Sequence, residues 1–289
     1  MDEFLRITEK YDEARFQDAF ASLENINAFA FAFYKDVAQI YDALTRVKNV
    51  QRNPTGFLLH DAPILGLLVR VWKLMKESIH YYEQNNAEII AILDRPLIEA
   101  AVVARYLMMN GNELVEDYRK CSYKERLRIL RDLESGVKFY ETKAGNRLLK
   151  SVREKMAFEK LTPDDFETQK KNRWKIGGKT FHDIFVDVEH ADFYACTYGM
   201  MSESIHGSWN ESMDWCLAKN EDGTFSAYPF YHAADVRCVA PMLRFTNEPY
   251  RLWLQRIGVY GDGFRDLLDW VERVNKRLFF EFDRQYDGG

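Results

Sequence analysis

Apolar and aromatic residues return at every third or fourth position through most of this chain. The clearest run lies within residues 9–48, at Phe16, Phe20, Leu23, Ile26, Phe29, Phe33, Val37, Ile40, Tyr41 and Leu44. Such spacing puts side chains on one face of an α-helix, whereas a half-buried strand alternates at every second residue. No extended run of strand alternation occurs. The pattern therefore predicts an all-α fold, a multi-helix bundle-like domain with at most a small β-hairpin.

Two adjacent segments are apolar enough to lie near the centre of the fold. Residues 58–82 are apolar on nearly all sides at first, and residues 87–109 follow after a short turn, which predicts an antiparallel pair of helices. Pro96 lies inside the second segment, where it either starts a new helix or kinks a continuous one. We expect residues 191–206 to supply the third helix of the core.

Turn residues divide the sequence into three regions. Residues 1–56 are expected to form an N-terminal helical region that ends in an Asn-Pro-Thr-Gly turn. Residues 57–218 are expected to form a central helical domain that carries the candidate polar site. Residues 219–289 are expected to form a C-terminal helical extension that packs on the same core, with a hairpin arm near residues 224–230.

The charge balance excludes a chain that attracts nucleic acid by its overall field. It has 40 Lys and Arg residues against 45 Asp and Glu residues, a formal net charge of −5. A contact with RNA would therefore need a local basic patch. Two clusters of basic residues qualify, although each is also typical of a solvated helix face: Arg119, Lys120, Lys124, Arg126, Arg128 and Arg131, and then Lys170, Lys171, Arg173, Lys175 and Lys179.

The cysteines and the apolar runs indicate the compartment. Cys121, Cys196, Cys216 and Cys238 lie far apart and form no Cys-x-x-Cys pair, which argues against a zinc knuckle or a disulfide framework. The first residues are charged, and no run of about 18 apolar residues occurs. We expect a soluble protein in the reducing cytoplasm, with no membrane partner. A protein partner stays open, and the sequence does not indicate the oligomeric state.

Hydroxyl and imidazole groups recur at helical spacing in one stretch. Tyr198, Ser202 and His206 are each four residues apart, so they form one polar stripe on a helix. Gly207 directly follows His206, and a glycine at that place is a usual signal for the end of a helix. The stripe has two interpretations. It either lines a functional pocket or belongs to a wet groove whose polar groups bond one another.

A second polar pair, Arg95 and Glu99, shares a helix face at the same spacing of four. The apolar flanks of both segments would draw the two helices into one core, where buried polar groups have to satisfy one another. We therefore expect Arg95, Glu99, Tyr198, Ser202 and His206 to line one pocket. The expected distance between the Arg95 guanidinium and the His206 ring is below about 12 Å, the outer limit that we set for direct or water-bridged contact.

Two Glu-x-x-His pairs, Glu77 with His80 and Glu203 with His206, allow a different interpretation. Helical bundles hold iron or manganese with such pairs and with additional bridging glutamates. Glu99 could bridge here, but no second bridging glutamate is evident. We expect no cofactor and no stoichiometric metal ion.

The order of these motifs resembles domain-of-unknown-function family 5677. The resemblance covers about residues 58–209 and implies an all-helical prokaryotic domain with no assigned activity. Pro96 departs from the smooth helix of that pattern. The motifs carry over six candidate site residues: Arg95, Glu99, Trp174 in a basic glycine loop, Tyr198, Ser202 and His206.

The pairing of polar helices also looks similar to HEPN-type helical ribonucleases, whose signature is Arg-x4-6-His within one helix. No arginine stands at that spacing before a histidine in this sequence. A ribonuclease would therefore have to assemble Arg95 and His206 from two helices.

The leading functional hypothesis is a metal-independent ribonuclease that acts as a toxin or a phage-defence effector. His206 would move the proton of a ribose 2′-OH, and Arg95 would stabilise charge on the phosphate. Tyr198 or Ser202 would position the phosphate, and Glu99 would orient Arg95 or His206. The alternatives are a non-catalytic helical module that binds a partner or small ligand and, less favoured, a carboxylate-bridged di-metal protein. Whether the chain is an enzyme stays open.

Overall fold

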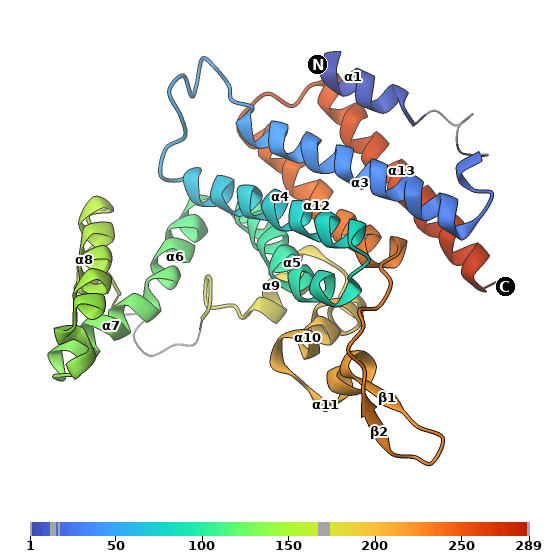
Figure 1. Ribbon diagram of the computed structural model, residues 1–289. Coiled ribbons are helices and arrows are strands. Elements are labelled where there is room, and N and C mark those ends of the chain that lie inside the picture. The colour runs from blue at the N-terminus through green and yellow to red at the C-terminus, as the bar shows by residue number, and fades with distance from the viewer. Residues whose placement is uncertain (1, 12–15, 17, 167–173, 288–289) are drawn as a thin grey trace. The chain divides into compact units, whose positions relative to one another are not determined.

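The computed structural model describes residues 2–11, 16, 18–166 and 174–287, and these are mostly helical (Figure 1). The expected all-α fold is confirmed. The chain forms two compact units, one of residues 1–109 with 184–289 and one of residues 110–183. The three regions expected from the sequence divide the chain at its turns, whereas these two units divide it by packing.

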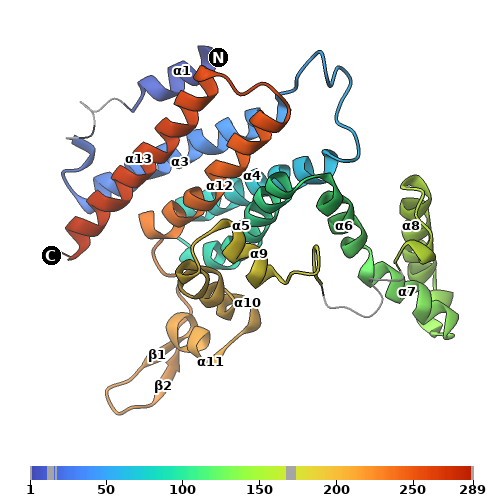
Figure 2. The ribbon, with the colours of Figure 1, turned by 180° about the vertical axis from the view of Figure 1, so that it is seen from behind.

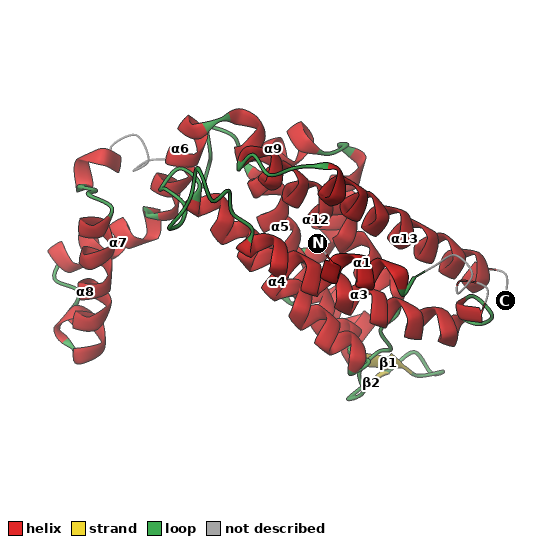
Figure 3. Cartoon of the chain, turned by 90° about the horizontal axis from the view of Figure 1, so that it is seen from above, coloured by secondary structure: helices red, strands yellow, loops and turns green. Residues whose placement is uncertain are grey.

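The larger unit contains the long helices. Figures 1 and 2 show α3, α4, α12 and α13 packed together, and Figure 3 shows from above that α3 lies between α4 and α13. No helix in the described part of the chain has the apolar length that crossing a membrane requires. The helices of this unit are α1 (Asp2–Glu9), α3 (Leu23–Arg46), α4 (Ala62–Glu83), α5 (Ala87–Asn110), α9 (Phe181–Val188), α12 (Val236–Arg256) and α13 (Asp262–Asp287).

Aromatic side chains fill the space between these helices. Tyr41 of α3 stacks on Tyr250 of α12 with ring centroids 4.2 Å apart, and both side chains are fully buried. The Tyr250 hydroxyl donates to the carbonyl oxygen of Leu68 in α4 at 2.9 Å, which satisfies its polar end. Full burial of a large apolar side chain contributes roughly 1.5–3 kcal/mol. The helices α3, α4 and α12 therefore stabilise one another.

A polar contact joins the same three helices. The side-chain oxygen of Asn27 in α3 accepts from the Tyr82 hydroxyl of α4 at 3.0 Å and from the backbone N–H of Val236 at 3.2 Å. Val236 is the first residue of α12, so Asn27 satisfies one of the N–H groups that a helix start leaves without an intrahelical partner.

Helix α5 continues through Pro96, so this proline does not start a new helix. The buried face of the helix contains Ile90, Leu97 and Ile98, and Asp94 lies within that face at 8% exposure. One oxygen of Asp94, Oδ1, is buried and has no hydrogen-bond partner among the described residues. Burial raises the pKa of Asp94 well above its ordinary value of 3.8, because the charged carboxylate loses its hydration.

Residues 191–206 do not form the expected long core helix. They form the π-helix η3 (Tyr194–Gly199) and the short α10 (Glu203–His206), and Tyr198 is the one buried residue among them. The Thr197 hydroxyl donates to the Phe193 carbonyl oxygen, and the Cys196 thiol donates to the Asp192 carbonyl oxygen at 3.3 Å. Such side-chain donors compete with the backbone for helix carbonyls. The expectation of a third core helix here is therefore wrong.

A small hairpin follows this segment. Helix α11 (Trp209–Glu211) and the π-helix η4 (Ser212–Cys216) lead into β1 (Leu217–Lys219), which pairs with the antiparallel β2 (Phe225–Ala227). The expected hairpin near residues 224–230 is confirmed. It is the only sheet that the described residues form, beside a single bridge between Ile176 and Lys179.

The smaller unit has a core of its own. Its elements are α6 (Asn112–Ser122), α7 (Lys124–Glu134), the 3-10 helix η1 (Lys138–Glu141), α8 (Lys143–Phe158) and the 3-10 helix η2 (Pro163–Phe166). The core consists of Tyr123, Leu127, Val152, Met156 and Phe166. Residues 110–183 therefore pack around a core of their own, although they interrupt the larger unit in sequence.

The first basic cluster lies in this unit and is partly neutralised within it. Arg119 forms ion pairs with Glu116 and Glu159, and the Arg126 guanidinium lies 4.8 Å from the centre of the Tyr123 ring. The second cluster falls partly outside the described residues, since Lys170, Lys171 and Arg173 are not described. RNA binding by these patches stays a prediction.

Gly145 in the first turn of α8 leaves no room for a side chain. A Cβ atom there would lie 2.2 Å from the Phe139 carbonyl oxygen and 2.5 Å from the Tyr140 Cα. Because these atoms belong to the backbone, Gly145→Ala is expected to destabilise the smaller unit by about 1–3 kcal/mol. Urea unfolding would measure this change. The matched control is Gly66→Ala in α4, where no atom lies within 4 Å, and this variant is expected to gain up to about 1 kcal/mol.

Equal stability of Gly145→Ala and the unchanged protein would contradict the predicted clash between the start of α8 and η1.

Candidate functional site

The expected polar residues meet in part, and Tyr198 lies at the centre of their cluster. The Tyr198 side chain is 5% exposed, and its hydroxyl donates to the Glu99 carboxylate at 3.0 Å. The Arg95 guanidinium lies over the Tyr198 ring, 4.6 Å from its centroid. Burial raises the pKa of Tyr198 well above its ordinary value, the Glu99 charge adds to this rise, and a hydrogen bond from Arg95 opposes it. Tyr198 therefore stays a protonated donor.

Helix α5 supplies two residues of this cluster. Arg95 and Glu99 are four residues apart on this continuous helix and both are half-buried, as their spacing predicted. The Glu99 carboxylate holds the Tyr198 hydroxyl in place, and the Arg95 guanidinium packs over the Tyr198 ring. A cation over an aromatic face contributes about 0.5–2 kcal/mol, depending on how far it is desolvated. The arrangement holds the Arg95 guanidinium at a defined place near the surface.

His206 completes the cluster from the last turn of α10. Arg95 Nη1 and His206 Nε2 are 3.4 Å apart, which confirms the expected distance of below about 12 Å. A guanidinium has only donors, so this contact is a hydrogen bond in the tautomer of His206 that carries its ring proton on Nδ1. Gly207 ends the helix with φ 60° and ψ 50°, the left-handed conformation expected for a glycine at this place. The His206 side chain is exposed.

Ser202 plays a different part from the one predicted. Its hydroxyl donates to the Tyr198 carbonyl oxygen at 3.1 Å, within the same segment of chain. This bond occupies the donor that would otherwise position a phosphate. Glu99 also differs in detail, since the hydrogen bond described for it comes from Tyr198 and orients the tyrosine rather than Arg95 or His206. Trp174 lies in the smaller unit, so its place relative to this site is not defined.

Three apolar side chains close to His206 in sequence are exposed. Met200, Ile205 and Trp209 are 65%, 44% and 59% exposed, and the Trp209 ring contacts Phe225 of β2 edge-on with centroids 5.8 Å apart. An exposed cluster of apolar side chains beside a polar site is typical of a surface that contacts a ligand or a macromolecule. Exposed apolar side chains therefore flank His206 along the chain in the larger unit.

Sequence reasoning missed Asp94, the neighbour of Arg95. Its signal was present, because Asp94 interrupts the apolar stripe formed by Ile90, Leu97 and Ile98 on α5. Sequence reasoning also missed the ion pair between Arg105 and Glu189, for which no local pattern exists. The two residues are 84 positions apart and meet only in the folded chain.

Elemental analysis of the purified protein is expected to show no stoichiometric iron, manganese or zinc. No three His, Cys, Asp or Glu side chains converge on one point in the described part of the chain. The His80 ring nitrogen Nε2 lies 2.9 Å from the side-chain nitrogen of Gln84. About two metal equivalents per chain, lost in Glu203→Ala but kept in Glu211→Ala, would instead favour the di-metal alternative.

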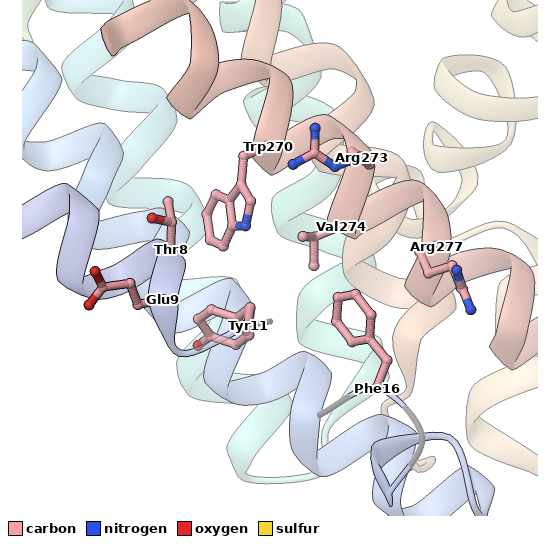
Figure 4. A pocket seen from close by; sticks show the side chains of 8 residues that line it. All are labelled: Thr8, Glu9, Tyr11, Phe16, Trp270, Arg273, Val274 and Arg277. Atoms are coloured by element: carbon pink, nitrogen blue, oxygen red, sulfur yellow. The ribbon is translucent and has the colours of Figure 1, made fainter. Parts of the chain in front are cut away.

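A separate cavity of about 550 Å³ lies between α1 and α13 and contains none of the predicted site residues. Figure 4 shows Trp270 of α13 extending toward Tyr11, whose ring centroid is 5.6 Å away, with Arg273 and Arg277 on the same helix. The Tyr11 hydroxyl is already bonded to Asp36 at 2.7 Å. The described lining of this cavity combines an aromatic cluster with Thr8, Glu9 and the two arginines.

Comparisons with known proteins identify one family. A family profile described as "Family of unknown function (DUF5677)" matches residues 61–224, more than half of the chain and the part that contains all five residues of the cluster. No curated protein and no solved structure matches the chain.

Proposed function

This chain belongs to the family of unknown function DUF5677, as the resemblance of its motifs predicted, and from its own residues we propose that it is a metal-independent ribonuclease. The observation that carries the proposal is the contact between Arg95 and His206, 111 residues apart in sequence and 3.4 Å apart in space. A fixed cation beside an accessible imidazole is a pair that phosphodiester cleavage can use, with one group for charge and one for the proton.

The proposed reaction is attack of a ribose 2′-oxygen on the adjacent phosphorus. His206 Nε2 accepts the 2′-OH proton, a new bond forms between the 2′-oxygen and phosphorus, and the bond from phosphorus to the 5′-oxygen breaks. Water protonates the leaving 5′-oxygen, and the protonated His206 then releases its proton to solvent. The products are a 2′,3′-cyclic phosphate and a 5′-hydroxyl. Arg95 stabilises the negative charge that collects on the non-bridging oxygens during the attack.

Substrate binding would prepare the base. Without substrate, an Arg95 N–H points at the same His206 nitrogen that has to accept the proton. A phosphate is a stronger partner for a guanidinium than a neutral imidazole, because the bond to it is charge-assisted. Transfer of this N–H from His206 to the phosphate would free the nitrogen lone pair next to the 2′-OH. Tyr198 and Glu99 act as positioning residues, since they hold the guanidinium in place.

A short labelled RNA incubated with the purified protein tests the proposal. Cleavage is expected to persist with an excess of EDTA and to leave 2′,3′-cyclic phosphate and 5′-hydroxyl ends. A matched oligodeoxynucleotide is expected to stay intact, because it lacks the 2′-OH. Intact RNA under all conditions, or cleavage that EDTA abolishes, would overturn the proposal. If the RNA is cleaved as expected, growth arrest of cells that express the protein would test a role as a toxin or phage-defence effector in the cytoplasm.

A second proposal, a binding module without catalysis, rests on the apolar surface around the cluster. Met200, Ile205 and Trp209 are 65%, 44% and 59% exposed, and such side chains mark an interaction surface where they form one contiguous patch. A partner would cover these side chains and direct an acidic group at Arg95. Trp209→Ala would then abolish binding of that partner, whereas the ribonuclease proposal expects cleavage to depend on His206 and much less on Trp209.

A further inference from the structure

A second hollow in the larger unit has the features of a small-molecule site. Its volume is about 660 Å³, and it lies among η3, α12 and α13. It contains none of the residues of the Arg95–His206 cluster, although Cys196 and Thr197 on its wall belong to the same π-helix as Tyr198. Small-molecule pockets usually enclose about 300–1,000 Å³. The hollow therefore has room for a ligand of several rings or of one ring with a charged group.

Two buried polar atoms in this lining have no partner among the described residues. Asn275 is 9% exposed; its amide nitrogen donates to the Ala240 carbonyl oxygen at 3.0 Å, but its oxygen Oδ1 accepts no hydrogen bond. Arg105 forms an ion pair with Glu189 through Nη1, but its buried Nε has no acceptor. Buried polar groups are nearly always paired in folded proteins. Both atoms are shielded from solvent, so a ligand in the hollow reaches them only after these side chains turn toward it.

The walls of the pocket favour a flat ring. Phe193, Phe245, Phe279 and Phe280 all line it, beside small apolar residues of α12. Aromatic side chains bind planar rings by stacked or edge-on contacts. The Arg244 guanidinium lies over the Phe193 ring, 4.0 Å from its centre, so a cation lies next to the aromatic wall.

The lining has two cations whose charges are weakly compensated. Arg244 is 51% exposed, and its nearest carboxylate oxygen, on Glu189, is 3.9 Å away. Lys276 is exposed and forms no ion pair in the described part of the chain. Glu248, an acidic residue of the same lining, pairs with Arg251 at 3.0 Å. Glu272 also lines the hollow and lies 3.9 Å from Arg251, so an anionic group on a ligand would meet Arg244 and Lys276 against this one distantly paired carboxylate.

We infer that this pocket binds a mononucleotide. The base lies between the phenylalanine side chains, and the phosphate contacts Arg244 and Lys276. The aromatic walls match the base of such a molecule, and the two cations match its phosphate. The inference does not depend on the ribonuclease proposal, because it uses none of the same side chains.

Isothermal titration calorimetry with AMP, GMP, CMP and UMP tests the inference, with adenosine and inorganic phosphate as separate arms. At least one mononucleotide is expected to bind about tenfold or more tightly than either phosphate or adenosine alone, because both halves of the molecule are recognised. Absence of binding by all four mononucleotides would overturn the inference. Equal affinity for phosphate and for the mononucleotides would overturn it as well, since the aromatic walls would then contribute nothing.

Substitutions in the lining test where the mononucleotide binds. The double change Arg244→Ala with Lys276→Ala is expected to weaken mononucleotide binding by about tenfold or more, because it removes two charge-assisted contacts. Arg273→Ala is the matched control, since it removes an exposed cation of the same helix at a different cavity. Phe280→Ala is expected to weaken mononucleotide binding but to leave phosphate binding unchanged. Unchanged mononucleotide affinity in the double variant would place the site elsewhere and overturn the inference.

These side chains are suitable for substitution because they are exposed. Arg244 and Phe280 are 51% and 59% exposed, and Lys276 is exposed too, so their loss leaves the aromatic centre of the larger unit intact. An unchanged circular dichroism spectrum and unfolding midpoint would show that weaker binding reflects the pocket rather than the fold.

Discussion

His206→Ala is expected to lower the rate of RNA cleavage by about 10²–10⁴-fold, the usual contribution of a positioned general base. The unfolding midpoint is expected to stay nearly unchanged, because the His206 side chain is exposed and no residue of α10 is buried. Cleavage of a labelled RNA, with thermal unfolding followed on the same samples, measures both quantities. The combination separates loss of a chemical group from loss of structure.

His190→Ala is the matched control, since it removes another exposed histidine, at a place where the ring contacts only Asp192 and Phe193. Its cleavage rate is expected to equal that of the unchanged protein. Arg95→Lys tests the partner of His206: the charge remains, but the planar stack over Tyr198 is lost, so an intermediate rate is expected. Full activity in His206→Ala would exclude this histidine as the base and would leave the binding module as the better proposal.

Asp94→Asn is expected to change how stability depends on pH. The pKa of Asp94 is raised in the folded protein above the unfolded value near 3.8, so folding takes up a proton at any pH between the two values. In that window the free energy of unfolding falls by about 1.4 kcal/mol for each unit of rising pH, and above the folded pKa this contribution is constant. Asparagine does not titrate, so the free energy of unfolding of the variant does not fall in this way. The variant is therefore expected to become more stable relative to the unchanged protein as pH rises.

Urea unfolding at a series of pH values from 4 upward, at about one-unit steps, would measure the two slopes. Asp192→Asn serves as the control, because that carboxylate is 87% exposed and its removal should leave the pH dependence as it is. Parallel stability curves for Asp94→Asn and the unchanged protein would contradict the predicted uptake of a proton by Asp94.

The helical class and the approach of the two site segments could be predicted from the sequence. Both follow from local spacing: apolar residues at three and four determine the helix faces, and polar residues at four determine which side chains point the same way. Arg95 and Glu99 share a face as predicted, and Tyr198 and His206 meet them. Gly207 ends α10 in the left-handed conformation, as its position directly after His206 predicted.

The geometry of residues 191–206 could not be predicted in the same way. Regular α-helical spacing predicts that Ser202 lies on the same polar face as Tyr198 and His206. The Ser202, Thr197 and Cys196 side chains instead donate to backbone carbonyl groups of the preceding turn. Whether such a donor turns outward or back onto the helix depends on the surrounding packing, which spacing does not reveal. The pairing of Arg105 with Glu189 likewise depends on the path of the whole chain.

The packing of α4 has an evolutionary consequence. The family profile spans residues 61–224, yet α4 at its start packs on α3 and α12, which both lie outside that span. A fragment cut at the family limits would lose Tyr250 and Asn27, the hydrogen-bond partners of Leu68 and Tyr82, and would expose an apolar helix prone to aggregation. Substitutions on α4 therefore require compensating substitutions in the flanking helices. We expect these flanks to be inherited together with the family region and to covary with it, even where their own sequences have diverged beyond recognition.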